Sequence, residues 1–352
     1  MTYVRNCWYV ACWSADITEK PFAAHILSER IVLYRAPSGA LVALEDRCVH
    51  RNAPLSVGRC EGANIRCLYH GLLFDADGRC IEIPGQDLIP EKARIRKYPV
   101  ADKHDWIWVW MGDPAKAEEN LIPPVAGLQH PEWLLGHGHI DIAGEARLMC
   151  DNLLDFTHLS YVHAAGFAAS DAWARSRPKF TQLPNGVRSE RWVVGDKGMR
   201  TREDAAPIDG WQSYDLLLPG ILIMWNGFYE AGTAAKMNMG APDPALTSFD
   251  VSLTCQAITP LKEKQTRYFW TWGPRKGPAD EAVLAALMSI ADEAFGEDRA
   301  IVEAQQRVLD DRPDAPIMPT NSDQGVLMYN RFVAELVRDE QSGSASPIRA
   351  TA

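Results

Sequence analysis

Four side chains between Cys48 and His70 constrain this chain more than any other feature of its sequence. Cys48 and His50 are separated by one residue, Cys67 and His70 by two, and sixteen residues lie between the two pairs. Each pair fits within one short loop. Two such loops can present two thiolates and two imidazoles to a single metal centre, so we expect a fold that holds the loops side by side.

This mixed set of ligands allows two interpretations. One is a zinc site, and the other is a Rieske [2Fe-2S] cluster, in which the two Cys hold one iron and the two His hold the other. Structural zinc sites commonly pair Cys with Cys and His with His along the chain. Here each loop supplies one of each, as a cluster with differently ligated irons requires, so the spacing favours the Rieske cluster.

The length and composition predict two domains with separate cores. The chain has 352 residues, of which 47% are hydrophobic and 23% are charged, as in ordinary globular proteins. The net charge of -10 would repel phosphate surfaces. We therefore expect no nucleic-acid or membrane partner, and we expect small molecules and redox proteins instead.

The N-terminal sequence and the cysteines predict a cytoplasmic protein. The first residues lack the apolar run of a signal peptide, and no later stretch approaches about 18 consecutive apolar residues. Eight cysteines in a chain of this size do not resemble a disulfide scaffold. Two of them serve better as metal ligands, and we expect free thiols at Cys7, Cys12, Cys60, Cys80, Cys150 and Cys255.

The first domain, residues 1–112, is predicted to be all-β. The runs Ile31–Tyr34 and Leu41–Leu44 flank a Pro-Ser-Gly segment, which indicates a hairpin. Trp106–Trp110 places three tryptophans on one face of a strand and two β-branched residues on the other, so both faces should be covered. Residues 113–124 are polar and bounded by prolines, as in a linker.

The second domain, residues 125–338, is predicted to be α+β, with an antiparallel sheet wrapped on a long helix in the helix-grip manner. Leu148–Ser160 and residues 279–310 have helical patterns. The expected strands are Trp211–Leu217, Ile221–Trp225, Ser248–Ile258 and Thr266–Trp272. The end, 339–352, is predicted to be a disordered tail.

A second group of polar residues lies on the first of these helices. Asn152, Asp155 and His158 fall at i, i+3 and i+6, in one polar stripe on an otherwise apolar helix. Burying them together costs several kcal/mol unless they find partners. His163 lies roughly 140° from His158 on a regular helix, so both can bind one metal only if the helix ends or loosens between them.

A ferrous site that activates oxygen needs a carboxylate beside two histidines. In the long helix Asp298 lies among apolar neighbours, whereas Glu303 neighbours polar residues and should be solvated. Asp298 is therefore the expected third ligand of a mononuclear Fe(II). Two alternatives remain at this stage: a buried, ion-paired Asp298, and a histidine pair that is satisfied in a core without metal.

These motifs together resemble the oxygenase (alpha) components of Rieske non-haem iron oxygenases. The residues that carry the resemblance are Cys48-x-His50 with Cys67-x2-His70, Asp155-x2-His158-x4-His163, and Glu297-Asp298. The opening Asn6–Cys12 and the position of Asn152 are similar to the branch that includes vanillate and dicamba O-demethylases. Respiratory Rieske proteins carry a disulfide between the ligand loops, and the corresponding places here hold Ala53 and Tyr69.

The resemblance implies a multicomponent enzyme. A ferredoxin or flavin reductase would take electrons from NADH and pass them to the cluster. In the homotrimer that the family forms, Asp155 would bridge the cluster ligand His70 of one subunit to His158 of the next. The iron on His158, His163 and Asp298 would use O₂ to oxidise an aromatic substrate, with Asn152 and Asp155 as further catalytic residues. For an aryl methyl ether, hydroxylation of the methyl group releases formaldehyde.

Two further functions remain open on the sequence alone. One is hydroxylation of the ring or of another side group by the same kind of enzyme. The other, from a different class, is a Rieske electron carrier without a mononuclear iron. The candidate pocket residues are Trp225, Asn226, Gln256 and Trp272, with ordinary sheet packing as the alternative, and Arg267 is a candidate counter-charge for an aromatic acid or else an exposed strand residue.

Overall fold

The computed structural model describes residues 3–164, 166–167, 169–197, 206–246, 250–277 and 280–343. The chain divides into two compact units, each described here by itself. The first unit comprises residues 5–122 with 259–263, and the second unit comprises residues 1–4, 123–258 and 264–352. The segment predicted to be a linker contains two short 3₁₀ helices, Pro114–Lys116 and Glu119–Leu121.

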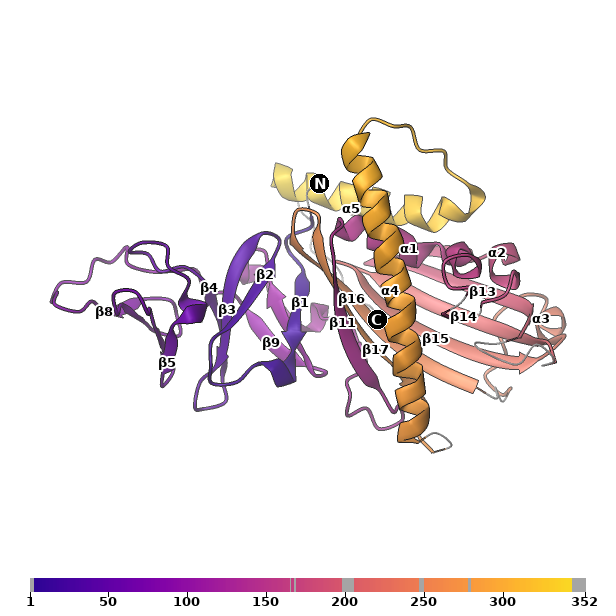
Figure 1. Cartoon of the computed structure of the whole chain (residues 1–352), viewed down its shortest axis with the longest axis horizontal. Helices are drawn as coiled ribbons and strands as arrows, with labels where there is room; N and C mark the ends of the chain where they lie inside the picture. The colour runs from indigo at the N-terminus through magenta and orange to yellow at the C-terminus, as the bar shows by residue number, and fades with distance from the viewer. Residues whose placement is uncertain are drawn as a thin grey trace. The chain divides into compact units, whose positions relative to one another are not determined.

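The first unit is built from three small sheets, as an all-β domain should be (Figure 1). In spatial order these are β1-β10-β9, β2-β3-β4 and β5-β6-β7-β8. Their bounds are β1 Trp8–Trp13, β2 Phe22–Ile26, β3 Glu29–Arg35, β4 Leu41–Glu45, β5 Arg59–Glu61, β6 Asn64–Arg66, β7 Leu73–Phe74, β8 Cys80–Glu82, β9 Val100–Lys103 and β10 Trp106–Trp110.

Strand β10 confirms the expectation that both of its faces are covered. All five of its side chains are at most 1% exposed. It lies between β1 and β9 in its sheet, so its backbone is hydrogen-bonded on both edges. A second cluster of buried side chains, which includes Cys48, Cys67 and Phe74, packs beneath the two short loops that carry the predicted cluster ligands.

The second unit contains a seven-stranded sheet in the order β11-β17-β16-β15-β14-β13-β12. The strands are β11 Gly136–Ile142, β12 Lys179–Leu183, β13 Gly186–Asp196, β14 Ile208–Leu217, β15 Ile221–Glu230, β16 Asp250–Lys262 and β17 Gln265–Pro274. The four strands expected from the pattern are present, and each extends beyond its predicted bounds at one end or both; residues 248 and 249 of the third lie outside the described residues. Strands β12 and β13 were not predicted, because the charged residues of β13 interrupt its apolar alternation.

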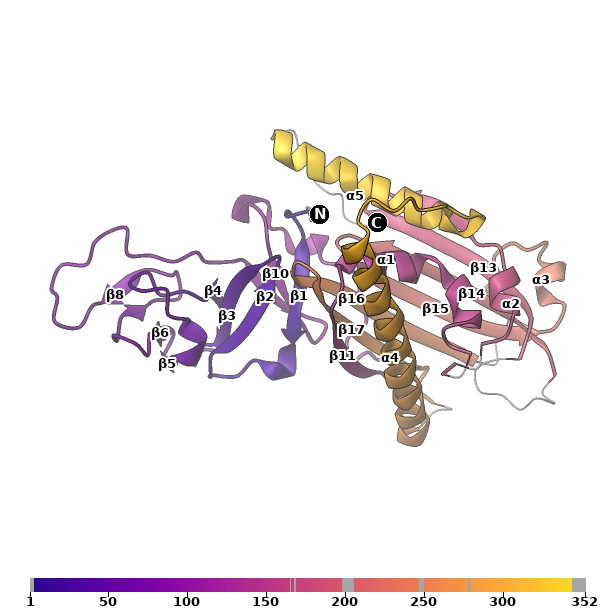
Figure 2. The ribbon, with the colours of Figure 1, turned by 45° about the horizontal axis from the view of Figure 1, so that its top comes forward.

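The helices of this unit lie on both faces of the sheet: most cover one face, and the short helix that contains Ala234 packs against Trp192 and Tyr229 on the other. They are α1 Ala146–Leu154, α2 Ala172–Arg175, α3 Thr233–Lys236, α4 Glu281–Asp311 and α5 Gln324–Ser342. Helix α4 crosses β11 and β17, and α5 packs over β12 and β13 at the other end of the sheet (Figures 1 and 2). Among the described helices, none is long and apolar enough to cross a membrane.

Helix α4 matches the helical pattern predicted for residues 279–310. It begins after Asp280, whose carboxylate accepts hydrogen bonds from the amides of Ala282 and Val283 at 3.0 Å each. Its buried positions follow helical spacing and include Asp298 within the apolar stripe.

On β11, Gly138 lies opposite Trp270, and a Cβ there would meet the indole ring at 2.5 Å, so glycine leaves the space that the ring fills.

The predicted disordered tail is wrong for residues 339–342. These residues continue α5, which ends only at Gly343, where φ is 74° and the amide donates to the carbonyls of Asp339 and Glu340. The composition of this segment gave no sign of the last turn of α5, which is capped by Gly343. The remainder of the predicted tail, 344–352, lies outside the described residues.

Candidate metal centres and substrate cavity

The two loops that carry the predicted cluster ligands are each closed by the same type of main-chain hydrogen bond. The amide of Cys48 donates to the carbonyl of Ala53 at 2.8 Å, and the amide of Cys67 donates to the carbonyl of Leu72 at 2.8 Å. Each loop therefore spans five residues from its Cys and presents its His inside that span. The loops hold their ligands through local bonds.

The turn at each loop also follows one pattern. The carbonyl of Cys48 accepts from the amide of Asn52 at 2.9 Å, and that of Cys67 accepts from Gly71 at 3.1 Å. Both turn residues have positive φ, 57° at Asn52 and 75° at Gly71. Asn and Gly adopt this left-handed conformation most readily, so the residue types at these two positions suit the turn.

The side chains on the loops divide into a buried pair and an exposed pair. Cys48 and Cys67 are at most 2% exposed, whereas His50 and His70 are exposed, with ring centroids 4.6 Å apart. Burial and then the neighbouring Cys67 thiol raise the pKa of Cys48 to about 11. This donor set fits a Rieske cluster, which the two buried cysteines and the two exposed histidines would hold.

The segment that carries Asn152, Asp155 and His158 departs from the expected single helix. Helix α1 ends at Leu154, and a separate 3₁₀ helix runs from Phe156 to Ser160. Asp155 lies between them with φ −122° and ψ 89°, and its carboxylate accepts from the amide of Thr157 at 3.0 Å. The predicted continuous stripe is therefore wrong, because an Asp that can cap a new turn competes with the regular helix.

The expected irregularity between the two histidines is present. The 3₁₀ helix ends at Ser160, and the amides of Tyr161 and Val162 both donate to the carbonyl of His158. This turn brings the imidazole of His163 to face that of His158, with ring centroids 5.2 Å apart. Two histidines that a regular helix would separate therefore share one site.

Asp298 of α4 meets the two histidines. The possible ligand atoms of His158, His163 and Asp298 all lie within 4.8 Å of one another. The Asp298 Oδ1 is 3.5 Å from His158 Nε2 and 3.2 Å from His163 Nε2. Two imidazoles and one carboxylate are the donor set that non-haem Fe(II) prefers, so these residues fit the predicted mononuclear iron.

Both histidines have a hydrogen-bond partner at Nδ1, which leaves Nε2 free to bind a metal. His158 Nδ1 lies 2.6 Å from the main-chain carbonyl oxygen of Asp155, and His163 Nδ1 lies 2.8 Å from Glu297 Oε2. A carbonyl oxygen only accepts, so the His158 proton belongs on Nδ1 and leaves the Nε2 lone pair free. The carboxylate of Glu297 favours the same tautomer in His163.

The electrostatics of the two histidines differ. Burial lowers the pKa of His158, and the nearby Asp298 only partly compensates. Burial also works against the charged form of His163, but Asp298 and Glu297 outweigh it and raise the pKa of that imidazole. Two carboxylates, those of Asp298 and Glu297, lie beside His163, and one, that of Asp298, lies beside His158.

The other two predicted catalytic residues also lie at this site. Asn152 Nδ2 donates to Asp298 Oδ1 at 3.0 Å, while Asn152 Oδ1 is buried with no hydrogen-bond partner among the described residues. The Asp155 carboxylate was expected to meet His158, and here the contact runs through its main-chain carbonyl instead. The carboxylate accepts from Thr157 and, at 2.8 Å, from Ser322 Oγ, because it caps the 3₁₀ helix.

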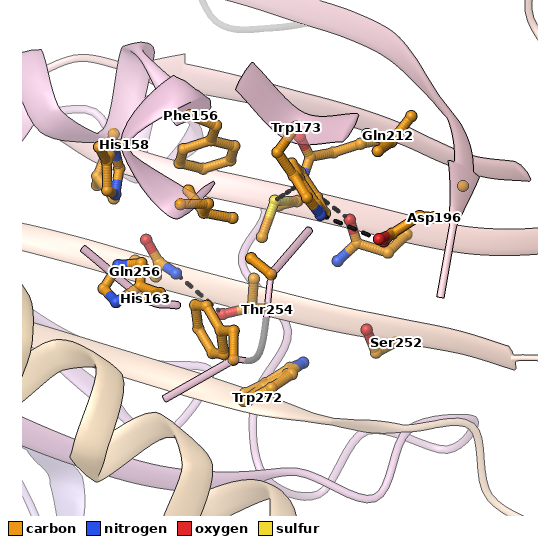
Figure 3. Close-up of a pocket in the computed structure, with 18 of the residues that line it drawn as sticks. Phe156, His158, His163, Trp173, Asp196, Gln212, Ser252, Thr254, Gln256 and Trp272 are labelled. Carbon is orange, nitrogen blue, oxygen red and sulfur yellow. Dashed lines mark hydrogen bonds between the residues drawn. The ribbon is translucent and has the colours of Figure 1, made fainter. Parts of the chain in front are cut away.

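A cavity in the second unit opens onto His158, His163 and Asp298. In Figure 3 the two labelled histidines lie at one end, Asp196 and Ser252 lie toward the other, and Trp173 and Trp272 lie between. The aromatic side chains of the wall are Phe156, Phe167, Trp173, Trp211, Phe228, Trp272 and Phe295. The uncharged polar side chains are Asn152, Gln212, Asn226, Ser252, Thr254 and Gln256.

Three of the four pocket residues considered from the sequence line this cavity. Asn226, Gln256 and Trp272 do so, whereas Trp225 packs against a different cluster that includes Trp192 and Tyr229. Trp225 is the next residue after Met224 and before Asn226, and side chains alternate between the two faces of a strand, so it points the other way.

The structure also places Arg267 away from the cavity. Its guanidinium forms two hydrogen bonds to the carboxylate of Asp141, at 2.6 and 2.8 Å. Arg267 is separated by an odd number of positions from the cavity residue Trp272, which puts the two side chains on opposite faces of β17. It is therefore not a counter-charge for a molecule in the cavity.

Sequence reasoning named Asn226 as a pocket residue but missed Gln212 and Ser252, which join it in a polar row across three strands. Gln212 of β14 is paired in register with Asn226 of β15, which is paired with Ser252 of β16. All three line the cavity, and Gln212 Nε2 donates to Asn226 Oδ1 at 3.2 Å. Only strand register brings them together, so no local pattern could have indicated the row.

Comparison with known proteins covers both units. Residues 7–99 match the Rieske [2Fe-2S] domain, and residues 142–339 match the vanillate O-demethylase oxygenase C-terminal domain. The iron-sulfur subunit of the toluene-4-sulfonate monooxygenase system of Comamonas testosteroni is 36% identical over 97% of this chain and 99% of its own length. The vanillate O-demethylase oxygenase subunit of Pseudomonas sp. HR199 is 31% identical over 97% of each chain.

The fold matches a solved structure over nearly its whole length. Dicamba monooxygenase bound to 3,6-dichlorosalicylic acid is similar with a TM-score of 0.86 and 28% sequence identity, covering 97% of this chain and 100% of that chain. The sequence matches cover both the cluster loops and the predicted iron ligands. The chain therefore belongs to the oxygenase components of Rieske non-haem iron monooxygenases, among which vanillate and dicamba O-demethylases are its relatives.

Proposed function

We propose that the chain catalyses the O₂-dependent O-demethylation of a methoxylated aromatic acid and releases formaldehyde. The observation that carries this proposal is the cavity beside His158, His163 and Asp298. Its aromatic wall suits a flat ring, and its uncharged polar row suits the hydrogen-bonding group of an acid. A substrate held by that row would direct another substituent toward the three predicted iron ligands.

The chain's own residues would prepare this chemistry. A mononuclear iron on His158, His163 and Asp298 would supply the activation of O₂. Asn152 holds Asp298 through its amide, and the Nδ1 partners of the histidines keep both Nε2 atoms directed at the metal. Largely apolar walls exclude water from the reacting substituent.

The overall reaction balances with one O₂ and two electrons. One oxygen atom enters a C–H bond of the methoxy group, and the other leaves as water after taking up two protons. The resulting hemiacetal collapses to a phenol and formaldehyde. The electrons would come from NADH through a ferredoxin or flavin reductase, which would reduce the cluster on Cys48, His50, Cys67 and His70 one electron at a time.

We further propose a homotrimer in which electrons pass between subunits. The exposed His70 of the partner subunit would approach Asp155, whose main-chain carbonyl contacts His158 at 2.6 Å. Asp155 is half-buried, and Ser322 and Thr157 hold its carboxylate. We also propose a cytoplasmic location, because the structure joins none of the described cysteines in a disulfide.

A second candidate reaction is hydroxylation of a methyl group or of another substituent on an aromatic sulfonate or carboxylate. The observation that favours it is the 36% identity with the iron-sulfur subunit of the toluene-4-sulfonate monooxygenase system. The same cavity and the same iron ligands would serve this reaction. The two candidates differ in product, because only O-demethylation releases formaldehyde.

The test is a screen of methoxylated benzoates and phenols, with the corresponding methyl-substituted benzoates and benzenesulfonates as a matched set. A generic reductase and NADH supply electrons, and formaldehyde and hydroxylated products are measured separately. Formaldehyde from a methoxylated acid supports the first candidate, and a benzylic alcohol without formaldehyde supports the second. Iron analysis runs alongside: about three irons per chain fits an oxygenase, and about two would indicate an electron carrier.

A further inference from the structure

The two predicted iron histidines differ in what holds their other nitrogen. His158 Nδ1 contacts a neutral main-chain carbonyl, whereas His163 Nδ1 contacts the carboxylate of Glu297. A carboxylate accepts a stronger hydrogen bond than a neutral carbonyl, because it carries a full charge. The imidazole of His163 is thus the more electron-rich of the two.

Glu297 and Asp298 are consecutive residues of α4, and they hold opposite sides of the same ring. Asp298 Oδ1 lies 3.2 Å from His163 Nε2, and Glu297 Oε2 lies 2.8 Å from His163 Nδ1. The His163 side chain is 1% exposed and that of Asp298 is 4% exposed, so their contact is away from bulk water, whereas the Glu297 side chain is 25% exposed. One rigid helix therefore determines the orientation of this imidazole.

The turn after His163 leaves room for the Glu297 carboxylate. A Cβ on Gly166 would lie 2.5 Å from Glu297 Oε2, a distance that real Cβ atoms do not reach. The ring of Phe167 packs against that of His163 in a T-shaped arrangement, with centroids 4.9 Å apart. A side chain at position 166 would therefore displace the Glu297 carboxylate, and glycine leaves the space that its contact with His163 needs.

We propose that Glu297 is a positioning residue of the mononuclear metal site. It holds the proton of His163 on Nδ1, orients the ring, and strengthens the donation of Nε2 to the metal. Together Glu297 and Asp298 supply two negative charges, which balance a divalent cation in a buried site. The inference rests on the proposed iron site and assigns within it a residue that is not itself a ligand.

The test measures how tightly the intact, cluster-containing protein holds its mononuclear iron. Wild type, Glu297→Gln and Glu297→Ala are equilibrated anaerobically with a series of chelator concentrations, and iron per chain is determined. We expect Glu297→Ala to bind the iron about 10- to 100-fold more weakly, and Glu297→Gln, which keeps an acceptor but loses the charge, to be weakened less. The visible spectrum of the cluster reports that each variant is folded.

Two further variants separate the contact from general charge effects. Asp292→Asn removes a charge from an exposed position on α4 and should leave iron affinity unchanged. Gly166→Ala changes neither charge nor ligand but crowds the Glu297 carboxylate, and it should weaken iron binding. Replacement of the iron by Co(II) adds a spectroscopic signature, because the absorption bands should shift in both Glu297 variants and not in Asp292→Asn.

The outcomes distinguish this inference from the proposed function. If the Glu297 variants retain wild-type iron affinity and Co(II) bands while His163→Ala loses the metal, the iron site stands and the positioning role is overturned. If His163→Ala also binds iron as tightly as wild type, the proposed iron site fails and the inference fails with it. Weakened binding in Glu297→Ala with an unaffected Asp292→Asn supports the proposal.

Discussion

The two predicted metal sites of this chain are assembled in opposite ways. The four predicted cluster ligands all lie in the stretch Cys48 to His70, and each loop closes on its own Cys through main-chain hydrogen bonds. The predicted iron site instead joins a turn that contains His158 and His163 to Asp298 of α4, 135 residues further along the chain. The ligands of the cluster site come from one short stretch of sequence, whereas those of the iron site come together only when distant elements pack.

The two predicted sites also differ in how deeply their ligands are buried. The cluster loops leave both histidines exposed, which suits the reception of electrons from another protein. His163 and Asp298 are 1% and 3% exposed, which suits chemistry from which water is excluded. The comparison suggests that changes at the iron site will abolish activity without affecting the cluster, and that changes in the loops will act on electron entry.

The largest effect is expected from removing an iron ligand. His163→Ala or Asp298→Ala should reduce the iron content from about three to about two per chain and lower turnover by at least about 1000-fold, because two remaining ligands hold Fe(II) poorly. Iron analysis and the visible spectrum of the cluster provide the measurement. Normal turnover at about two irons per chain would show that activity does not need the proposed mononuclear iron.

The next effect tests the proposed connection between the sites. Asp155→Asn should leave both centres loaded yet lower NADH-driven turnover by about 100-fold, because an amide cannot supply the charge that the bridge to the partner's His70 requires. Ser322→Ala removes one hydrogen bond to the same carboxylate and serves as the milder control. Turnover of Asp155→Asn close to that of wild type would reject the bridging role.

A third change acts on the cluster alone. His50→Cys should lower the reduction potential of the cluster on the order of 100 mV, if the cluster assembles, because His ligation raises the potential relative to all-Cys clusters. The mononuclear iron should be retained in full. Protein-film voltammetry measures the potential, and an unchanged value would mean that His50 is not a ligand.

The smallest effect concerns the geometry of one loop. Gly71→Ala places a Cβ at positive φ and 3.0 Å from Pro84 Cγ, so it should destabilise the first unit by about 1–2 kcal/mol and speed cluster loss on heating. Gly39→Ala is the matched control, since its φ is 85° but no atom lies within 4 Å of the new Cβ. Equal rates of cluster loss in the two variants would show that the loop tolerates crowding.

Sequence alone was sufficient for the local features of this protein. The ligand spacing in the cluster loops, the all-β pattern around Trp106–Trp110 and the buried position of Asp298 on a long helix are all written in neighbouring residues. The break between His158 and His163 was also predictable, because helical geometry forbids their sharing a metal without it. Periodicity and spacing report only on residues that lie within a few turns of one another along the chain.

Tertiary structure decided what depends on distant partners. The Asp155 carboxylate accepts a hydrogen bond from Ser322, 167 residues further along the chain, and Asp155 contacts His158 through its main-chain carbonyl. The polar row of the cavity exists only through the register of three strands, and the role proposed for Glu297 depends on α4 meeting the turn at Gly166. Such contacts are selected by the packing of whole elements, which no short pattern of residues encodes.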